Sequence, residues 1–361
     1  MTISAHRRQT RTTSTASSPG RPGRPAPSRR PDIRAISRRP SAAARLAATL
    51  AMDGSQTLAP LNTALDHLRG PGAGRLDGLA NPLVVGDLCG WTTARDLITG
   101  GAFDRFVSAA HRHWPSSPPA ELALGWKAYS YWVMLPTVLS WAVSRRLPLL
   151  EARDIVVRFP PGPAPLQIGL RHARVAVLPN DPLAATGTPA VIVLPSESAM
   201  LAALRDRLLD RHLRPLAERI RRERRLGRRT LLGTVAAGVG HLAVQAADAI
   251  ASSAPVPGSA PIPDPAAIPS SAPGAGPAPV PGPAPGASSA PGASSALGAG
   301  SATREASILL QALGLAHFVE LSDQPPVVRR RTCCLAFRGP RGGTCPGCCL
   351  PTAIGRSPVS R

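Results

Sequence analysis

A stretch of low complexity from Ala251 to Ala302 most limits what this chain of 361 residues can fold into. Alanine, proline, serine and glycine supply 46 of its 52 residues, and the hexapeptide Pro-Gly-Ala-Ser-Ser-Ala occurs twice in tandem from Pro285. This composition lacks the large apolar side chains that a core needs, and it is typical of a linker that is partly flexible and partly extended. The chain therefore divides into a foldable body and a short C-terminal segment.

The N-terminal residues form a second segment that we expect to be disordered. They are rich in arginine, proline and serine and carry few large apolar side chains, so they cannot offset the entropy lost on ordering. Ser37-Arg38-Arg39 is similar to a twin-arginine leader, but Pro40 follows it and Arg45 interrupts the apolar stretch, so we predict no export signal. Met52 is a second candidate for the first residue. The predicted divisions are a tail at 1–41, a body at 42–250, the linker at 251–302, a C-terminal helix and cysteine segment at 303–350, and a tail at 351–361.

The spacing of apolar residues predicts a mostly helical body. Five segments show helical periodicity, and the second of them is interrupted at Gly100-Gly101: Gln56–Leu68, Thr93–His113, Pro119–Arg146, Ser198–Arg225 and Arg229–Ile250. Four short, partly β-branched segments bounded by turn residues predict a small antiparallel sheet: Asp154–Phe159, Leu166–Leu170, Arg174–Leu178 and Ala190–Leu194. We therefore expect an α+β fold, and we expect a further apolar helix at Ile308–Phe318 to dock back on the body.

The charge of the chain is unevenly distributed. Arginine and lysine total 42 against 21 acidic residues, and the net charge is +21. The excess lies in residues 1–46, 203–229 and 326–341, and the remainder is close to neutral. In the second stretch, acidic residues are spaced to form helical ion pairs, as on a solvated helix face, although anion contact is an alternative. Overall basicity is thus no argument for nucleic-acid binding, and we expect no nucleic-acid partner.

No long, strongly apolar segment predicts a membrane span. The nearest candidate, Leu231–Ala251, carries His241, Gln245 and Asp248 and consists mostly of small residues. We interpret it as a helix of a soluble protein, expect at most peripheral membrane association, and place the protein in the cytoplasm.

Five of the six cysteines crowd near the C-terminus: Cys333, Cys334, Cys345, Cys348 and Cys349. Such clustering without an export signal indicates metal chemistry rather than a disulfide framework. The glycine- and proline-rich arm between Cys334 and Cys345 can fold back so that four thiolates converge. A zinc ribbon usually pairs two Cys-x-x-Cys knuckles, but here one pair is adjacent, so its side chains diverge. This spacing favours a [2Fe–2S] cluster, with its two separate irons, and leaves zinc open.

The cysteine pattern resembles the signature of the FhuF-type siderophore ferric-iron reductases. Its elements are the pair Cys333-Cys334, a ten-residue gap and Cys345-x-x-Cys348. Two segments of the body resemble that family more loosely: Ala123-Leu-Gly-Trp-Lys-Ala-Tyr-Ser-Tyr-Trp and Asp210-Arg-His-Leu-Arg-Pro-Leu. The resemblance covers roughly residues 55–250 and 304–350, whereas the N-terminal tail and the linker depart from it.

The resemblance implies that Cys333, Cys334, Cys345 and Cys348 hold a [2Fe–2S] cluster, and Cys349 is surplus to the pattern or an alternative fourth ligand. It also implies that the protein transfers one electron to Fe(III) in a ferric siderophore. Reduction releases the metal because Fe(II) binds hard oxygen ligands more weakly. The chain has no dinucleotide-binding fingerprint, so a separate electron donor such as a ferredoxin or a reductase is expected.

Five arginines lie before the first cysteine pair or between the two halves of the cysteine pattern: Arg329, Arg330, Arg331, Arg338 and Arg341. A [2Fe–2S] cluster with four thiolates is doubly negative when oxidised and triply negative when reduced, so nearby positive charge raises its reduction potential. We select Arg331 and Arg338 as candidate contacts for an anionic siderophore or an acidic donor. The alternative is that all five arginines simply form a solvated surface.

Two other functions remain open. The chain is alternatively a non-enzymatic zinc or cluster-sensing module whose basic segments bind nucleic acid. The second alternative is a siderophore-binding or siderophore-biosynthesis protein in which the cysteines only stabilise the C-terminus. Outside the cluster, we expect Cys89 to be a small buried apolar residue and the large aromatic residues to pack in the core.

Overall fold

The computed structural model describes residues 56–69, 76–253, 299–323, 326–339, 344–345 and 347–350. All of them belong to one compact unit within residues 42–361. The two predicted tails and residues 254–298 of the predicted linker lie outside the described residues.

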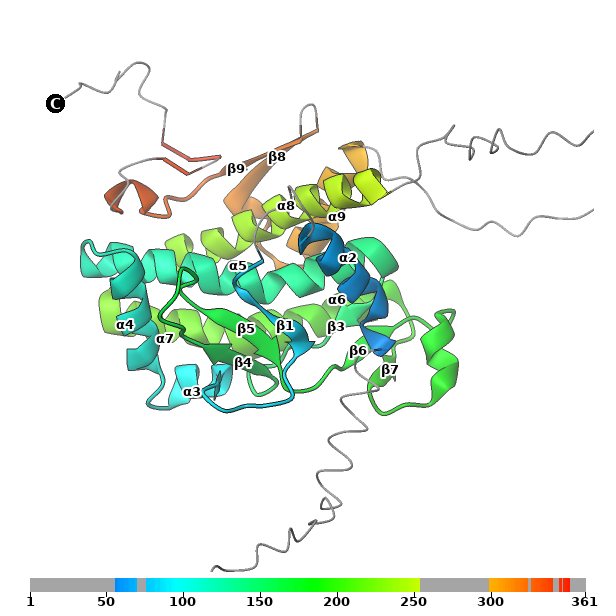
Figure 1. The fold of residues 1–361 in the computed structure, drawn as a ribbon. Helices are drawn as coiled ribbons and strands as arrows, with labels where there is room; N and C mark the ends of the chain where they lie inside the picture. Colours follow the sequence, from blue (N-terminus) through cyan, green and yellow to red (C-terminus); the bar gives the residue numbers. More distant parts are fainter. Residues whose placement is uncertain are drawn as a thin grey trace, which may run out of the picture. The chain divides into compact units, whose positions relative to one another are not determined.

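Helices make up most of the described fold, as the periodicity predicts (Figure 1). The predicted break at Gly100-Gly101 separates α3 from α4, and the predicted helix Ser198–Arg225 is one continuous helical run that includes a π-helix, η2. The bounds are α2 Ala59–Arg69, α3 Ala94–Thr99, α4 Phe103–His113, α5 Pro118–Ser144, α6 Glu197–Leu204, η2 Arg205–Leu213, α7 Arg214–Arg224, α8 Arg228–Ser253 and α9 Ala299–Leu313. Short 3-10 turns lie at Pro182–Thr186, Ala316–Phe318 and Ala336–Arg338.

The helix α5 is the centre of the core. It is apolar around its whole circumference, and Trp126, Tyr129 and Trp141 are fully buried along it. A helix of this kind requires neighbours on all sides, and α2, α4 and α8 pack against it. Trp126, Tyr129 and Trp141 are therefore core residues, as expected, whereas Tyr131 and Trp132 are partly buried and pack against the core.

Seven of the described strands form two sheets beside these helices. The class is α+β as predicted, but the four predicted strands divide between two mixed sheets and do not form one antiparallel sheet. Of the four predicted strands, β4 and β5 pair antiparallel with Ile155 opposite Leu170, while β6 and β7 pair parallel in the second sheet with Val175 opposite Val191. The strand orders are β1-β5-β4-β2 and β3-β6-β7. Their bounds are β1 Leu79–Val84, β2 Thr92–Thr93, β3 Leu147–Pro148, β4 Ile155–Arg158, β5 Gln167–Leu170, β6 Val175–Val177 and β7 Val191–Val193.

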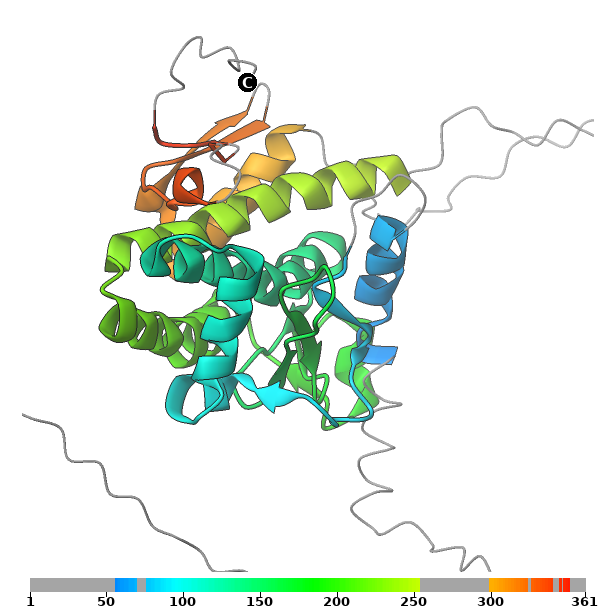
Figure 2. The same cartoon turned by 60° about the vertical axis from the view of Figure 1, so that its left-hand side comes forward.

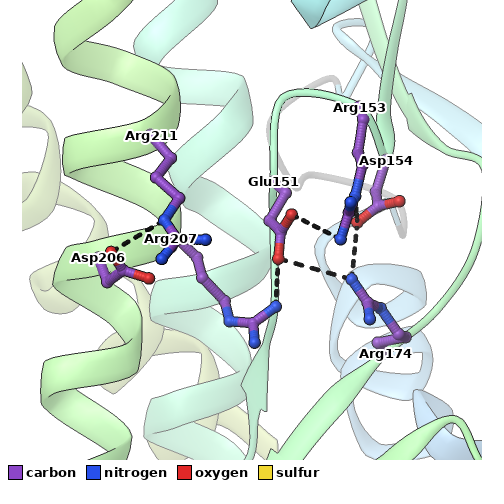
Figure 3. A network of polar contacts seen from close by, with 7 residues as sticks. All are labelled: Glu151, Arg153, Asp154, Arg174, Asp206, Arg207 and Arg211. Carbon is purple, nitrogen blue, oxygen red and sulfur yellow. Dashed lines mark hydrogen bonds and ion pairs between the residues drawn. The ribbon is translucent and has the colours of Figure 1, made fainter.

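A network of ion pairs ties the π-helix to the segment between the sheets (Figure 3). The buried carboxylate of Glu151 contacts Arg207 of η2 and lies 2.9 Å from Arg153 Nη2. Arg174 Nη2 lies 3.2 Å from Asp154 Oδ2. On the exposed side of η2, Arg211 Nε lies 3.0 Å from Asp206 Oδ1. The arginine-rich stretch therefore contributes structural ion pairs, as the charge pattern indicates for this part of the chain.

The C-terminal segment docks on the body, as expected. The helix α9 packs against α8 and α6, and an antiparallel hairpin of β8 (Val319–Asp323) and β9 (Pro326–Arg330) follows it and lies over α8 (Figures 1 and 2). Arg145 donates two hydrogen bonds to Glu305 of α9, and Trp141 Nε1 donates a third to Glu305 Oε2 at 3.0 Å. These buried polar contacts fix α9 to the end of α5.

Among the described residues, one helix segment is long and apolar enough to cross a membrane. This is Arg228–Ala247 of α8, and 72% of its most apolar window is buried within the protein. It packs along α5 and α9, which accounts for its apolar composition as that of a core helix.

The prediction for Cys89 was wrong. Its side chain is exposed in the loop between β1 and β2, where its backbone N–H donates to Asp87 Oδ1 over 2.9 Å. The apolar character of cysteine is overridden here because an Asx turn places the residue on the surface.

Candidate metal centre

The cysteine segment approaches the body across a face of α8 that is made of small residues. A Cβ atom on Gly233 would lie 1.9 Å from Thr332 Oγ1, and one on Gly240 would lie 2.7 Å from Val328 Cγ1. Only a residue without a side chain fits such distances. The two glycines of α8 therefore allow the strand before the first cysteines to lie directly on the helix.

The Cys345-x-x-Cys348 knuckle is held against β9. The N–H of Cys348 donates to the carbonyl of Cys345 over 3.1 Å, which closes the turn, and the N–H of Arg330 donates to the carbonyl of Gly347 over 2.8 Å. Gly347 has a φ of +66°, and a Cβ there would lie 2.0 Å from the carbonyl oxygen of Val328. The knuckle thus requires glycine at position 347 for both its backbone conformation and its contact with the strand.

The two halves of the cysteine pattern meet at Cys334 and Cys345. Their sulfur atoms lie 3.3 Å apart, and the cysteines of the chain that the structure describes are free thiols. The remaining predicted ligands each accept a backbone hydrogen bond at sulfur: Leu335 N donates to Cys333 Sγ over 3.3 Å, and Leu350 N donates to Cys348 Sγ over 3.4 Å. Such bonds stabilise thiolates.

The electrostatics of the pair favour one thiolate. The hydrogen bond from Cys345 holds the pKa of Cys334 well below its usual range, and the charges of Arg330 and Lys127 act in the same direction against burial. The shared proton raises the pKa of Cys345. Burial raises the pKa of the surplus cysteine, Cys349.

Arg330 is the buried charge of this region. Its residue exposure is 3%, its Nη2 donates to Thr234 Oγ1 over 2.8 Å, and its Nε has no hydrogen-bond partner among the described residues. No described carboxylate forms a salt bridge with it. A buried guanidinium without an anion costs several kcal/mol, so the site is one that an anionic group would stabilise.

The described thiols are not arranged around a metal ion in this structure. Within the described ranges, no three histidine, cysteine, aspartate or glutamate side chains are arranged as a metal-binding group. The 3.3 Å between Cys334 Sγ and Cys345 Sγ is shorter than the about 3.8 Å between two thiolates on one tetrahedral metal ion. The thiolates, the amide donors to sulfur and the unpaired Arg330 nonetheless match the chemistry that a negatively charged iron–sulfur group requires. The residues therefore fit the group chemically, provided that the sulfur atoms of Cys334 and Cys345 move slightly further apart.

The arginines selected from the sequence lie outside this buried region. Arg331 pairs with Glu320 at 3.1 Å, and both side chains are about half exposed. Arg338 lies over the ring of Phe337, with 5.6 Å from its Cζ to the ring centroid. Their positions near the cysteines leave the proposed contact role as a prediction.

Sequence reasoning missed that Lys127 and His241 lie beside the cysteine segment. Together with Arg330 and Gly347 they line a pocket of about 410 Å³ between α5, α8 and β9. Lys127 is the single lysine of the sequence, and it lies in the segment of α5 that loosely resembles the siderophore-reductase family. These two features could have indicated that Lys127 lies near the site. The other large pocket described here, of about 620 Å³ around Trp91 and Arg158, involves no described cysteine of the cluster region.

A comparison of the chain with models of protein families found no match. Comparisons with curated proteins and with solved structures also found none.

Proposed function

We propose that this protein is a cytoplasmic iron–sulfur ferric-siderophore reductase of the FhuF type. In this role it transfers one electron to Fe(III) held by a siderophore and releases Fe(II) for cellular iron uptake. The observation that carries the proposal is the Cys-Cys-x10-Cys-x2-Cys pattern, whose two halves meet at Cys334 and Cys345 beside the unpaired charge of Arg330.

The proposed ligands are Cys333, Cys334, Cys345 and Cys348. When bound, a [2Fe–2S] cluster supplies one-electron transfer at a potential that its surroundings set. The side chain of Arg330 supplies buried positive charge, which favours the more negative, reduced state. The backbone amides of Leu335 and Leu350 donate to two of the sulfurs and act in the same direction. A separate electron donor, such as a ferredoxin or a reductase, completes the reaction.

Anaerobic purification tests the proposal directly. We expect a brown protein with about two irons and two sulfides per chain, whose colour bleaches on reduction with dithionite and returns when a ferric siderophore is added. Electron paramagnetic resonance of the reduced protein identifies the cluster type. A colourless protein that holds zinc would overturn the proposal in favour of the metal-binding module with basic nucleic-acid-binding segments.

Cysteine variants separate the ligands from the other thiols. Cys345→Ser is expected to lose the cluster and all ferric-siderophore reduction, and Cys349→Ser is expected to keep both. Cys89→Ser is the matched control, because this cysteine is exposed in a loop of the first sheet. Reduction by a cluster-free Cys345→Ser variant would contradict the proposal, and retained siderophore binding in that variant would favour a binding protein.

A further inference from the structure

The segment that carries the proposed cluster ligands lies at the surface of the fold. It forms the outer layer on the side of α8 that faces away from the two sheets (Figures 1 and 2). Cys333, Cys345 and Cys348 are partly exposed, and of the four proposed ligands Cys334 alone is buried. A redox group held by these thiols can therefore be approached from solvent on this side, by a protein as well as by a small molecule.

Two large apolar side chains are exposed beside these cysteines. Phe337 is 38% exposed and Leu350 is 39% exposed. Phe337 follows Cys334 by three residues and Leu350 follows Cys348 by two, so each lies within about 11 Å of a proposed ligand, because one residue spans at most about 3.6 Å. Since Cys334 Sγ and Cys345 Sγ lie 3.3 Å apart, both apolar side chains belong to one region of the surface.

Basic side chains accompany this apolar pair. Residues 326–350 contain five arginines and no acidic residue. Arg329, Arg331 and Arg338 are exposed, and among the described residues only Arg331 of these three forms a salt bridge, with Glu320. The Cζ atom of Arg338 lies 5.6 Å from the ring centroid of Phe337. Aromatic residues and arginines are enriched among the side chains that contribute most to protein–protein binding.

Resting on the proposed function, we propose that this surface docks the electron donor, and that the donor is a small acidic one-electron carrier protein. The donor face is defined by Arg329, Arg331, Phe337, Arg338 and Leu350. An acidic carrier is attracted and oriented by the arginines, whereas a neutral or basic carrier is not. The carrier then gives up one electron to the oxidised cluster, and no covalent bond forms or breaks.

The reductive half-reaction tests the proposal without a siderophore. The probe is a flavodoxin, an acidic one-electron carrier, which is mixed in its fully reduced form with the oxidised full-length protein. Its one-electron oxidation, followed by absorption, gives a second-order rate constant. We expect this rate constant to fall as the ionic strength rises, because salt screens the attraction between opposite charges. A rate constant that is independent of salt, or that rises with it, would overturn the proposal.

Variants locate the docking. Arg338→Glu is expected to lower the rate constant at low ionic strength at least about tenfold. Phe337→Ala is expected to lower it about fivefold and to keep its dependence on salt. Arg95→Glu is the matched control, because Arg95 is exposed on α3, on the opposite side of the fold from β9 (Figures 1 and 2); its effect is expected to stay within about twofold. Equal effects of Arg338→Glu and Arg95→Glu would overturn the proposal.

Reduced methyl viologen separates docking from a change in the reduction potential. It is a small cation, and Arg338→Glu makes the donor face more negative. Methyl viologen is therefore expected to reduce this variant at least as fast as wild type, while flavodoxin reduces it more slowly. Slower reduction by both donors would assign Arg338 to the potential of the cluster and overturn its role in docking.

Binding of oxidised flavodoxin, measured by calorimetry on the same preparations, distinguishes this proposal from the proposed function. A protein with a cluster that passes electrons from methyl viologen to a ferric siderophore, but binds flavodoxin equally well in wild type and Arg338→Glu, would support the reductase function and overturn the donor face. A protein without iron that binds flavodoxin and loses this binding in Arg338→Glu would overturn the reductase function and support the donor face.

Discussion

Arg330 donates a hydrogen bond from Nη2 to Thr234 Oγ1 over 2.8 Å, and this contact ties the strand that precedes the cysteines to the middle of α8. Thr234 Oγ1 in turn donates to the carbonyl of Thr230 over 2.8 Å, so the hydroxyl both accepts and donates a hydrogen bond. The guanidinium keeps an unpartnered Nε in the part of the chain that the structure describes. Among the described residues, no carboxylate compensates its charge. This gives a prediction for the metal-free protein and another for the protein with the proposed cluster.

Arg330→Met is expected to stabilise the metal-free protein and to lower the reduction potential of the proposed cluster. Replacing an unpaired buried charge with a side chain of similar length removes its desolvation cost, so we expect the free energy of unfolding without iron to rise by about 1–4 kcal/mol. With the cluster bound, the loss of positive charge lowers the reduction potential. Urea unfolding and spectroelectrochemistry measure the two effects. A lower free energy of unfolding for the metal-free variant, or an unchanged reduction potential, would contradict the assignment of Arg330 as the counter-charge.

Gly347→Ala is expected to abolish cluster assembly. The left-handed backbone and the carbonyl of Val328 leave no room for a Cβ, so the knuckle must leave β9. Iron content per chain, measured after anaerobic reconstitution, tests this. Gly86→Ala is the control, because a Cβ there meets no atom within 4 Å. Full iron content in Gly347→Ala would show that the docked knuckle is not needed.

Glu305→Ala is expected to lower the free energy of unfolding by about 1–3 kcal/mol. This carboxylate is 6% exposed and accepts hydrogen bonds from Arg145 and Trp141. Its removal leaves the buried Trp141 N–H without an acceptor, whereas Arg145, whose side chain is 42% exposed, can bind water instead. Glu320→Ala removes the exposed ion pair with Arg331 and is expected to cost less than about 1 kcal/mol. Chemical denaturation compares the two variants, and equal effects would mean that α9 is held by its apolar contacts alone.

His212 is expected to make the fold sensitive to mild acid. It is buried in η2 beside Tyr129, with 2.6 Å between Tyr129 Oη and His212 Nε2, and burial lowers its pKa from 6.5 to about 4. Between these pH values the unfolded chain binds a proton that the folded protein does not. The free energy of unfolding therefore falls by about 1.4 kcal/mol for each pH unit as the pH drops through this window.

The variant His212→Gln removes this titration and keeps a polar partner for Tyr129. We expect the difference in stability between wild type and variant to change in favour of the variant as the pH falls from 6.5 to about 4. The exposed His67, replaced by Gln, serves as the control. A difference that does not depend on pH would exclude His212 as the source.

The sequence predicts the long helices well and the strands less completely. The helices α5 and α8 have apolar patterns of more than twenty residues, and such patterns are robust. The strand β1 was missed because Asn81 and Pro82 interrupt its apolar pattern, although proline is tolerated at the edge of a sheet, where β1 lies. The hairpin of β8 and β9 was missed for a similar reason, since two consecutive prolines, Pro325-Pro326, interrupt the β-strand pattern of the sequence.

In the candidate site, the approach of Cys334 to Cys345 could be predicted from the sequence, whereas the burial of Arg330 could not. The spacing of Cys334 and Cys345 indicates that their sulfurs can meet, because a glycine- and proline-rich arm between them can fold back. The run Arg329-Arg330-Arg331 gives no local reason why its central member is buried. That difference arises from strand alternation together with the glycines of α8, and only the tertiary arrangement combines them.

The docking of α9 on the body determines how this chain tolerates changes in the length of the connection between α8 and α9. The contact between Glu305 and Arg145 joins elements on either side of residues 254–298, so the two parts recognise each other through their own surfaces, as two subunits do. The length of the connection then sets only their effective concentration, and doubling it costs about 0.6 kcal/mol of closure entropy. Variants of this chain with a longer or shorter connecting segment, or divided into two polypeptides at this point, are therefore expected to form the same junction.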